Sequence, residues 1–249
     1  IYNTGGTLAF GLSPIFITWF VGRFGLEQMP YTLVLGAAAF LICLKYLPVP
    51  VSEKLQNMGF FGSLKEMLGK VYKPILMIWL VMFMRAVTGQ TFMTFMPIQL
   101  SNNGHALMSV GTIVALFVLA GTLSGLLSGY LADRMDIRKI FMAAHLLMTP
   151  ALLFYLSHTG PLVYAAAFLA GFFVLATLPL GVVLAQRLAP KSRSMVSSLM
   201  MGLAYGLGGA ISPFIGKLAD IYGLETALFY SALVPLLSIV FIFKFPKTS

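Results

Sequence analysis

The stretch GLLSGYLADRMDIRKIFM, residues 125–142, holds a short charged segment between two long apolar runs. Five charged side chains lie within seven residues, namely Asp133, Arg134, Asp136, Arg138 and Lys139. Charges concentrated at the ends of apolar runs are typical of the turns that join membrane-spanning helices. The stretch therefore predicts a helical hairpin whose turn lies in water.

The composition of the whole chain agrees with this interpretation. Hydrophobic residues make up 59% of the chain, charged residues 9%, and the mean hydropathy is +0.93, whereas a soluble domain carries about 25% charge. Runs of about 20 apolar residues recur and must be helical, because hydrocarbon offers the backbone no hydrogen-bonding partner. The predicted class is an all-α integral membrane protein with eight spans. The spans are expected near residues 3–22, 30–47, 75–97, 108–129, 140–157, 162–186, 195–216 and 226–244.

The basic residues predict the orientation of these spans. Of the 16 Lys and Arg residues, 13 flank one side of the predicted membrane, Arg23 and Lys217 flank the other, and Arg85 lies in mid-span. Basic residues gather in cytoplasmic loops, so the richer side is predicted to be cytoplasmic. An even number of spans then places both ends of the chain in the cytoplasm. The net charge of +9 is thus a topology signal, and no nucleic-acid partner is expected.

An internal repeat indicates two related halves. Residues 11–27 read GLSPIFITWFVGRFGLE, and residues 210–225 read AISPFIGKLADIYGLE. Parallel repeats of this kind are a known construction of membrane transporters. We therefore expect residues 1–47 to be the last two helices of an N-terminal six-helix half and residues 74–249 to be a C-terminal six-helix half. The complete molecule is expected to have twelve spans, four of which would precede this chain.

Residues 48–73 form the longest polar segment and would join the two halves. Ser63 and Glu66 have the spacing of a capping box. Leu64, Leu68 and Val71 would then form one apolar stripe, flanked by lysines. This pattern predicts a short amphipathic helix on the cytoplasmic membrane surface, with docking of a partner as the alternative.

The charged turn resembles the loop signature of the major facilitator superfamily, Gly-x-Leu-Ala-Asp-Arg-x-Gly-Arg-Lys. The matching residues are Gly129, Leu131, Ala132, Asp133 and Arg134, and Arg138 and Lys139 retain the basic end. The resemblance implies a major-facilitator helix bundle in which Gly129 allows a close helix contact. It also implies that Asp133 latches the cytoplasmic side at a helix N-terminus, although topology alone could explain these charges. Asp136 stands where the signature has glycine, and aspartate can adopt a left-handed turn there more readily than most residues.

Two further segments resemble the fosmidomycin-resistance branch of that superfamily. They are RAVTGQTFMTFMPIQL at 85–100 and LAPKSRSMVSSLMMGLAYGLGGAISPFIGKLAD at 188–220. The resemblance implies an inner-membrane, proton-driven exporter of small drug-like or anionic molecules, monomeric when complete, with no cofactor besides the coupling proton. Proton-coupled uptake of an organic anion is the alternative. A membrane enzyme or a channel is remote, because the chain shows no cluster of a nucleophile, a base or metal ligands.

Arg85 is the most informative single residue, because a charge deep in a span is costly and usually functional. All seven acidic residues lie in or near predicted loops, so no partner for Arg85 is expected at membrane depth within this chain. Its partner could be a carboxylate elsewhere, an anionic substrate or water in a cavity. Further substrate or coupling candidates are Thr88, Gln90, Thr177 and Tyr205.

Prolines and glycines predict where two helices bend. Ser13-Pro14 and Ser212-Pro213 each follow several glycines, a pattern that favours close helix contact and a kink. Cys43 is the single cysteine and is expected to be a buried apolar residue. The three histidines lack metal-ligand spacing, so no metal site is predicted.

Overall fold

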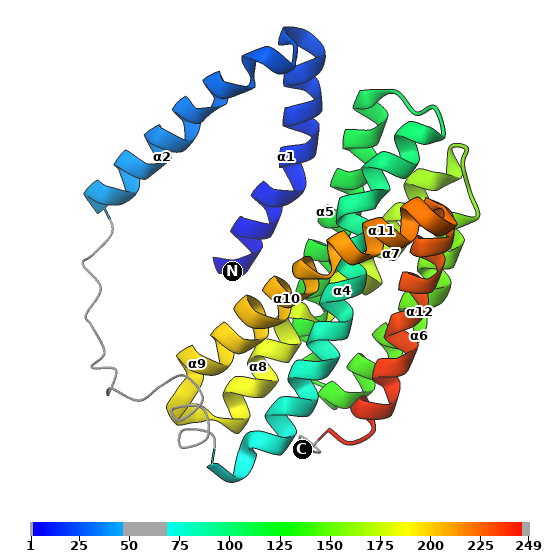
Figure 1. The fold of residues 1–249 in the computed structure, drawn as a ribbon. Coiled ribbons are helices and arrows are strands. Elements are labelled where there is room, and N and C mark those ends of the chain that lie inside the picture. Colours follow the sequence, from blue (N-terminus) through cyan, green and yellow to red (C-terminus); the bar gives the residue numbers. More distant parts are fainter. Residues whose placement is uncertain (1, 47–68, 246–249) are drawn as a thin grey trace.

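The computed structural model describes residues 2–46 and 69–245, and within these ranges all regular structure is helical (Figure 1). Seven helices are long and apolar enough to cross a membrane, and Leu8–Phe24 is a shorter apolar helix, which is consistent with the eight predicted spans. The α-helices are α1 (Tyr2–Phe24), α2 (Leu33–Tyr46), α4 (Tyr72–Asn102), α5 (Leu107–Ala132), α6 (Ile137–Leu156), α7 (Leu162–Ala176), α8 (Leu178–Leu188), α9 (Arg193–Ser197), α10 (Ala204–Ala210), α11 (Ser212–Tyr222) and α12 (Leu224–Ile242).

The helices from α4 to α12 pack into one bundle (Figure 1). Its tightest contact joins α5 and α7, where a Cβ atom on Gly171 would collide with the backbone of Phe117 and one on Gly121 would collide with Leu175. Small residues at such positions let helix backbones approach closely. In a membrane this van der Waals packing drives helix association, because lipid is as apolar as the helix surfaces and provides no hydrophobic driving force. The glycines of α5 and α7 therefore fix the crossing that supports the centre of the bundle.

α1 packs on α5, whereas α2 stands apart at the edge of the molecule (Figure 1). At the crossing, a Cβ atom on Gly111 would lie 2.8 Å from the Pro14 carbonyl oxygen, and Leu119 fills the space beside Gly11. No residue of α2 is buried. Cys43 is accordingly exposed, so the prediction that it is buried was wrong: an apolar residue in a membrane protein can face lipid as readily as a core.

The sequence repeat has a structural counterpart at the ends of α1 and α11. Gly25 follows α1 with φ 85° and ψ 161°, and Gly223 follows α11 with φ 90° and ψ 146°. Both are positive-φ positions that favour glycine, and each glycine N–H donates to the carbonyl four residues earlier at 2.9 Å. The two copies thus end their helices with the same backbone turn.

The Ser-Pro pairs of the repeat behave differently. The helix assignment is interrupted at Ile211, directly before Ser212-Pro213, which is where the sequence predicts a kink. α1 instead runs without interruption through Pro14, because the Ser13 hydroxyl donates to the Phe10 carbonyl at 2.9 Å. That carbonyl would otherwise lack a donor, since proline has no N–H. The kink predicted at Pro14 is therefore not a helix break in this structure.

Two other predicted features also differ from the structure. The span predicted at 162–186 is divided into α7 and α8 by Thr177, and the span predicted at 195–216 contains a π-helix, Ser198–Leu203, and extends through α11. Close contact was expected along the glycines of that second span. Gly208 does meet Ala86 of α4, but a Cβ atom on Gly202 or Gly206 would meet no described atom within 4 Å. The amphipathic helix predicted within 48–73 lies mostly outside the described residues.

Candidate functional site

Arg85 occupies the centre of α4 with 1% of its surface exposed. Its Nη1 donates a hydrogen bond of 3.2 Å to the carbonyl oxygen of Val174, near the end of α7. Its guanidinium carbon lies 5.1 Å from the centre of the Tyr205 ring on α10, a cation–π arrangement. Three separate helices therefore hold the guanidinium in place, and the structure brings together Tyr205 and Arg85, both of which were predicted as site residues.

The Val174 carbonyl lies three residues before Thr177, where the helix assignment is interrupted. Pro179 has no N–H, and its ring clashes with the carbonyl four positions earlier, that of Leu175, so carbonyls at this end of α7 need other donors. Val174 accepts from Arg85, Leu175 accepts from the Thr177 N–H, and Ala176 accepts from the Ser128 hydroxyl at 2.7 Å. The break is thus supported by side chains from α4 and α5.

One edge of the Arg85 guanidinium has no partner within the described residues. Nε and Nη2 are both buried and make no hydrogen bond. These two nitrogens form one side of the planar guanidinium fork, the geometry that binds carboxylate or phosphate oxygens in pairs. Arg85 has no acidic partner within residues 2–46 and 69–245. The acidic side chains of these ranges lie at helix ends or in turns; they are Glu27, Asp133, Asp136, Asp220 and Glu225.

Thr177 lies at the break itself and is fully buried. It is the N-cap residue of α8, yet its side chain makes no capping hydrogen bond, and its Oγ1 has no partner among the described residues. An unbonded buried hydroxyl costs about 1–3 kcal/mol. The Thr177 hydroxyl therefore has no described hydrogen-bond partner, and it belongs to the residue three positions after Val174, whose carbonyl binds Arg85.

Two predicted substrate or coupling residues remain, Thr88 and Gln90. The Thr88 hydroxyl donates to the Ser231 carbonyl at 3.1 Å, and this bond joins α4 to α12. Gln90 is half-buried, and its Nε2 would lie 4.0 Å from a Cβ atom on Gly209. The structure thus joins Arg85 to Tyr205 and to the Val174 carbonyl, three residues before Thr177, but gives Thr88 a structural bond.

The charged turn contains a helix cap that the family signature does not provide. Asp136 adopts an extended conformation (φ −60°, ψ 123°) and its carboxylate accepts from the Arg138 N–H at the start of α6 at 3.0 Å. Asp133 is the C-cap residue of α5 and its side chain is exposed. The carboxylate at a helix N-terminus is therefore that of Asp136, and the residue does not use a left-handed turn.

The neighbours of these two aspartates contact aromatic rings or solvent. Arg134 lies 4.4 Å from the Tyr130 ring centre, Arg138 lies 5.7 Å from the Phe243 ring centre, and Lys139 is exposed. A Cβ atom on Gly129 would meet nothing within 4 Å among the described residues. The close helix contact that the resemblance implies at Gly129 is thus absent from the described part of the chain.

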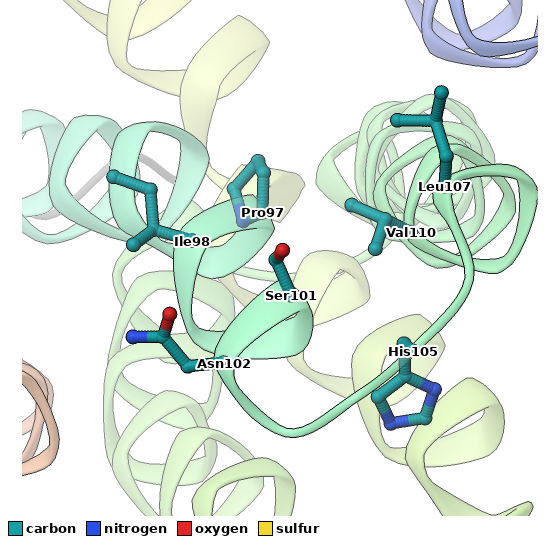
Figure 2. Close-up of a pocket in the computed structure, with 7 residues that line it drawn as sticks. All are labelled: Pro97, Ile98, Ser101, Asn102, His105, Leu107 and Val110. Carbon is teal, nitrogen blue, oxygen red and sulfur yellow. The ribbon is translucent and has the colours of Figure 1, made fainter. Parts of the chain in front are cut away.

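A pocket of about 350 Å³ opens at the end of the bundle that holds the α4–α5 turn (Figure 2). Its polar lining consists of Ser101, Asn102 and His105, and Pro97 and Val110 are among its apolar residues. None of the predicted site residues lines this pocket. Within the described ranges no group of three or more His, Cys, Asp or Glu side chains could hold a metal ion.

A broken helix whose freed carbonyls bind side chains from neighbouring helices is typical of membrane transporters, where irregular backbone lines a binding site. The sequence pattern of the Major Facilitator Superfamily matches residues 78–249. The chain belongs to this family.

Two curated relatives resemble part of the chain. The uncharacterized MFS-type transporter YfnC of Bacillus subtilis (strain 168) is 33% identical over 128 residues, which cover 51% of this chain and 31% of the relative. The putative multidrug resistance protein MdtD of Cronobacter sakazakii is 27% identical over 145 residues, which cover 57% of this chain and 31% of the relative. The matched region thus spans about a third of the length of these relatives. Both names describe transport or resistance and neither describes an enzyme, in agreement with the sequence prediction.

Solved structures confirm the fold. A single-site variant of the E. coli fucose:proton symporter FucP superimposes with a TM-score of 0.65 at 17% identity, over 89% of this chain and 55% of that one. FucP in the outward conformation gives a TM-score of 0.64 at 16% identity, over 98% and 69% respectively. The chain is therefore a multi-pass membrane protein with a major-facilitator fold.

The sequence prediction missed the break between α7 and α8, and with it Val174 and Ser128. The signal for the break was present in Pro179, which interrupts an otherwise uniform apolar run. The backbone carbonyl of Val174 leaves no trace in the sequence, because every residue has a carbonyl. Ser128 lies next to the conspicuous Gly129, but only the fold brings it to Ala176.

Proposed function

We propose that the chain belongs to a proton-coupled secondary transporter that exports a small anionic or drug-like molecule, such as a fosmidomycin-like antibiotic, by alternating access. The observation that carries the proposal is the buried guanidinium edge of Arg85, whose Nε and Nη2 have no described partner. A charge at this depth costs about 3 kcal/mol or more. An anionic ligand that binds there would recover part of that cost through paired, charge-assisted hydrogen bonds.

The transporter would lie in the inner membrane with both ends of this chain in the cytoplasm. The repeat supports a second six-helix half as the partner of α4–α12, in which α1 and α2 would be the last two helices. The packing of α1 on α5 supports contact between the halves at this crossing. The carboxylate that couples protons would belong to that other half, the substrate would be the only small-molecule partner, and the complete protein would act as a monomer.

Inside-out membrane vesicles that contain the full-length protein test this function. When the lumen is acidified, an exporter should accumulate radiolabelled fosmidomycin as protons leave, and the accumulation should stop when an ionophore collapses the pH gradient. Proton-coupled uptake, the alternative, would instead move fosmidomycin out of preloaded vesicles together with protons. Fosmidomycin that does not move in either direction would contradict both assignments of substrate.

A further inference from the structure

Resting on the proposed function, we infer that the break between α7 and α8 is itself the binding site for an oxyanion head group, with Thr177 as the second binding residue beside Arg85. A helix carbonyl points toward the C-terminal end of its helix. The guanidinium that binds the Val174 carbonyl at 3.2 Å therefore lies on the side of Val174 that faces Thr177 and the start of α8.

The electrostatics of the break favour this arrangement. The C-terminal end of α7 carries a partial negative charge and binds the Arg85 cation, whereas the N-terminal end of α8 carries a partial positive charge and favours an anion. α8 has 11 residues. In its first turn only the Leu178 and Leu180 amides lack an acceptor within the helix, because Pro179 has no N–H and the Gly181 N–H donates to the Thr177 carbonyl at 3.0 Å. An anion between the guanidinium edge and this end of α8 would be attracted by both.

The unbonded donors define what the site can bind. Arg85 offers Nε and Nη2, and Thr177 offers its hydroxyl, and all three groups are buried without a described partner. The planar guanidinium edge binds two oxygens of one anion, which leaves the Thr177 hydroxyl for a third. The site therefore suits a head group with three oxygens on one centre better than a carboxylate with two.

The neighbouring polar groups at the break are already committed. Ser128 donates to the Ala176 carbonyl at 2.7 Å, and the Thr177 carbonyl accepts from the Gly181 N–H at 3.0 Å. These bonds hold the two helix ends without using the Thr177 hydroxyl. The hydroxyl is thus available to a ligand that reaches the break during alternating access.

Binding of methylphosphonate and acetate to the purified full-length protein tests the inference by calorimetry. Thr177→Val keeps the side-chain shape and removes the hydroxyl, and it should weaken methylphosphonate binding by roughly tenfold, the value of one hydrogen bond to a charged group. It should weaken acetate binding much less. Thr177→Ser should bind within about twofold of the wild type, because it retains the donor.

Thr149→Val is the matched control, because the Thr149 hydroxyl is also buried but donates to the Ala232 carbonyl at 2.7 Å. It should lower thermal stability and leave the affinity for methylphosphonate unchanged, whereas Thr177→Val should not lower stability. Normal methylphosphonate binding by Thr177→Val together with loss of binding by Arg85→Ala would overturn the role of Thr177 and leave the proposed function standing. Binding that survives both substitutions, or no binding by the wild type, would contradict the site as a whole.

Discussion

At the scale of single residues, the structure assigns a different interaction to each part of the Arg85 side chain. Nη1 is fixed by the Val174 carbonyl, the guanidinium carbon lies 5.1 Å from the Tyr205 ring centre, and the Nε–Nη2 edge has no described partner. A guanidinium held in this way loses little further entropy when it binds an anion, because its plane is already set. Tyr205 is then a positioning residue.

Replacement of Tyr205 tests this positioning role. Tyr205→Phe retains the aromatic ring and should bind methylphosphonate within about twofold of the wild type. Tyr205→Leu removes the cation–π contact, which is worth about 1 kcal/mol, and should weaken binding roughly fivefold. Equal affinities of the two variants in the calorimetric assay would show that the ring does not orient Arg85.

At the scale of helices, breaks and caps determine where polar groups lie in an apolar chain. The cap of α6 is Asp136, whose carboxylate accepts from the Arg138 N–H, whereas the Asp133 side chain is exposed. Loss of an N-cap aspartate costs about 1 kcal/mol. Asp136→Ala should therefore lower the thermal stability of the purified protein, and Asp133→Ala, as the matched control, should leave it nearly unchanged. A larger effect of Asp133→Ala would mean that the cap has been assigned to the wrong residue.

The helices also show which features a sequence can predict. Eight spans and their approximate limits follow from the apolar runs, because lipid demands long helices and charges mark their ends. Arg85 was recognised for the same reason, since it is the one charge deep within a predicted span. The break at Thr177 was missed because a proline near the centre of an apolar run can lie in a continuous helix, as Pro14 does, or end one. Side chains bond nearby carbonyls in both places, so the apolar run and its proline do not by themselves distinguish the two outcomes.

At the scale of the whole molecule, the proposed topology can be tested by cysteine labelling in a Cys43→Ala background. Met135→Cys and Ser194→Cys should resist a membrane-impermeant thiol reagent outside intact cells, because both positions are expected on the cytoplasmic side. Asn103→Cys and Thr159→Cys should react, because they lie in turns at the other end of the bundle. All four positions are exposed, so a reversed labelling pattern would invert the topology.

The two-half organisation is the other prediction at this scale. The repeated glycine turns at Gly25 and Gly223 and the contact between α1 and α5 are consistent with it. The relation between the halves could not be derived further from the sequence, because contacts between helices depend on small residues, such as Gly111, whose partners only the fold reveals.

The most direct test of the central claim compares Arg85→Ala and Arg85→Lys in the vesicle transport assay, with Arg187→Ala as a matched control for loss of an exposed arginine. If Arg85 binds an oxyanion through its Nε–Nη2 edge, lysine cannot reproduce the paired hydrogen bonds. Both Arg85 variants should then lose proton-driven fosmidomycin export, while Arg187→Ala exports normally. Export at the normal rate by Arg85→Ala, at equal expression and under the same proton gradient, would contradict the account.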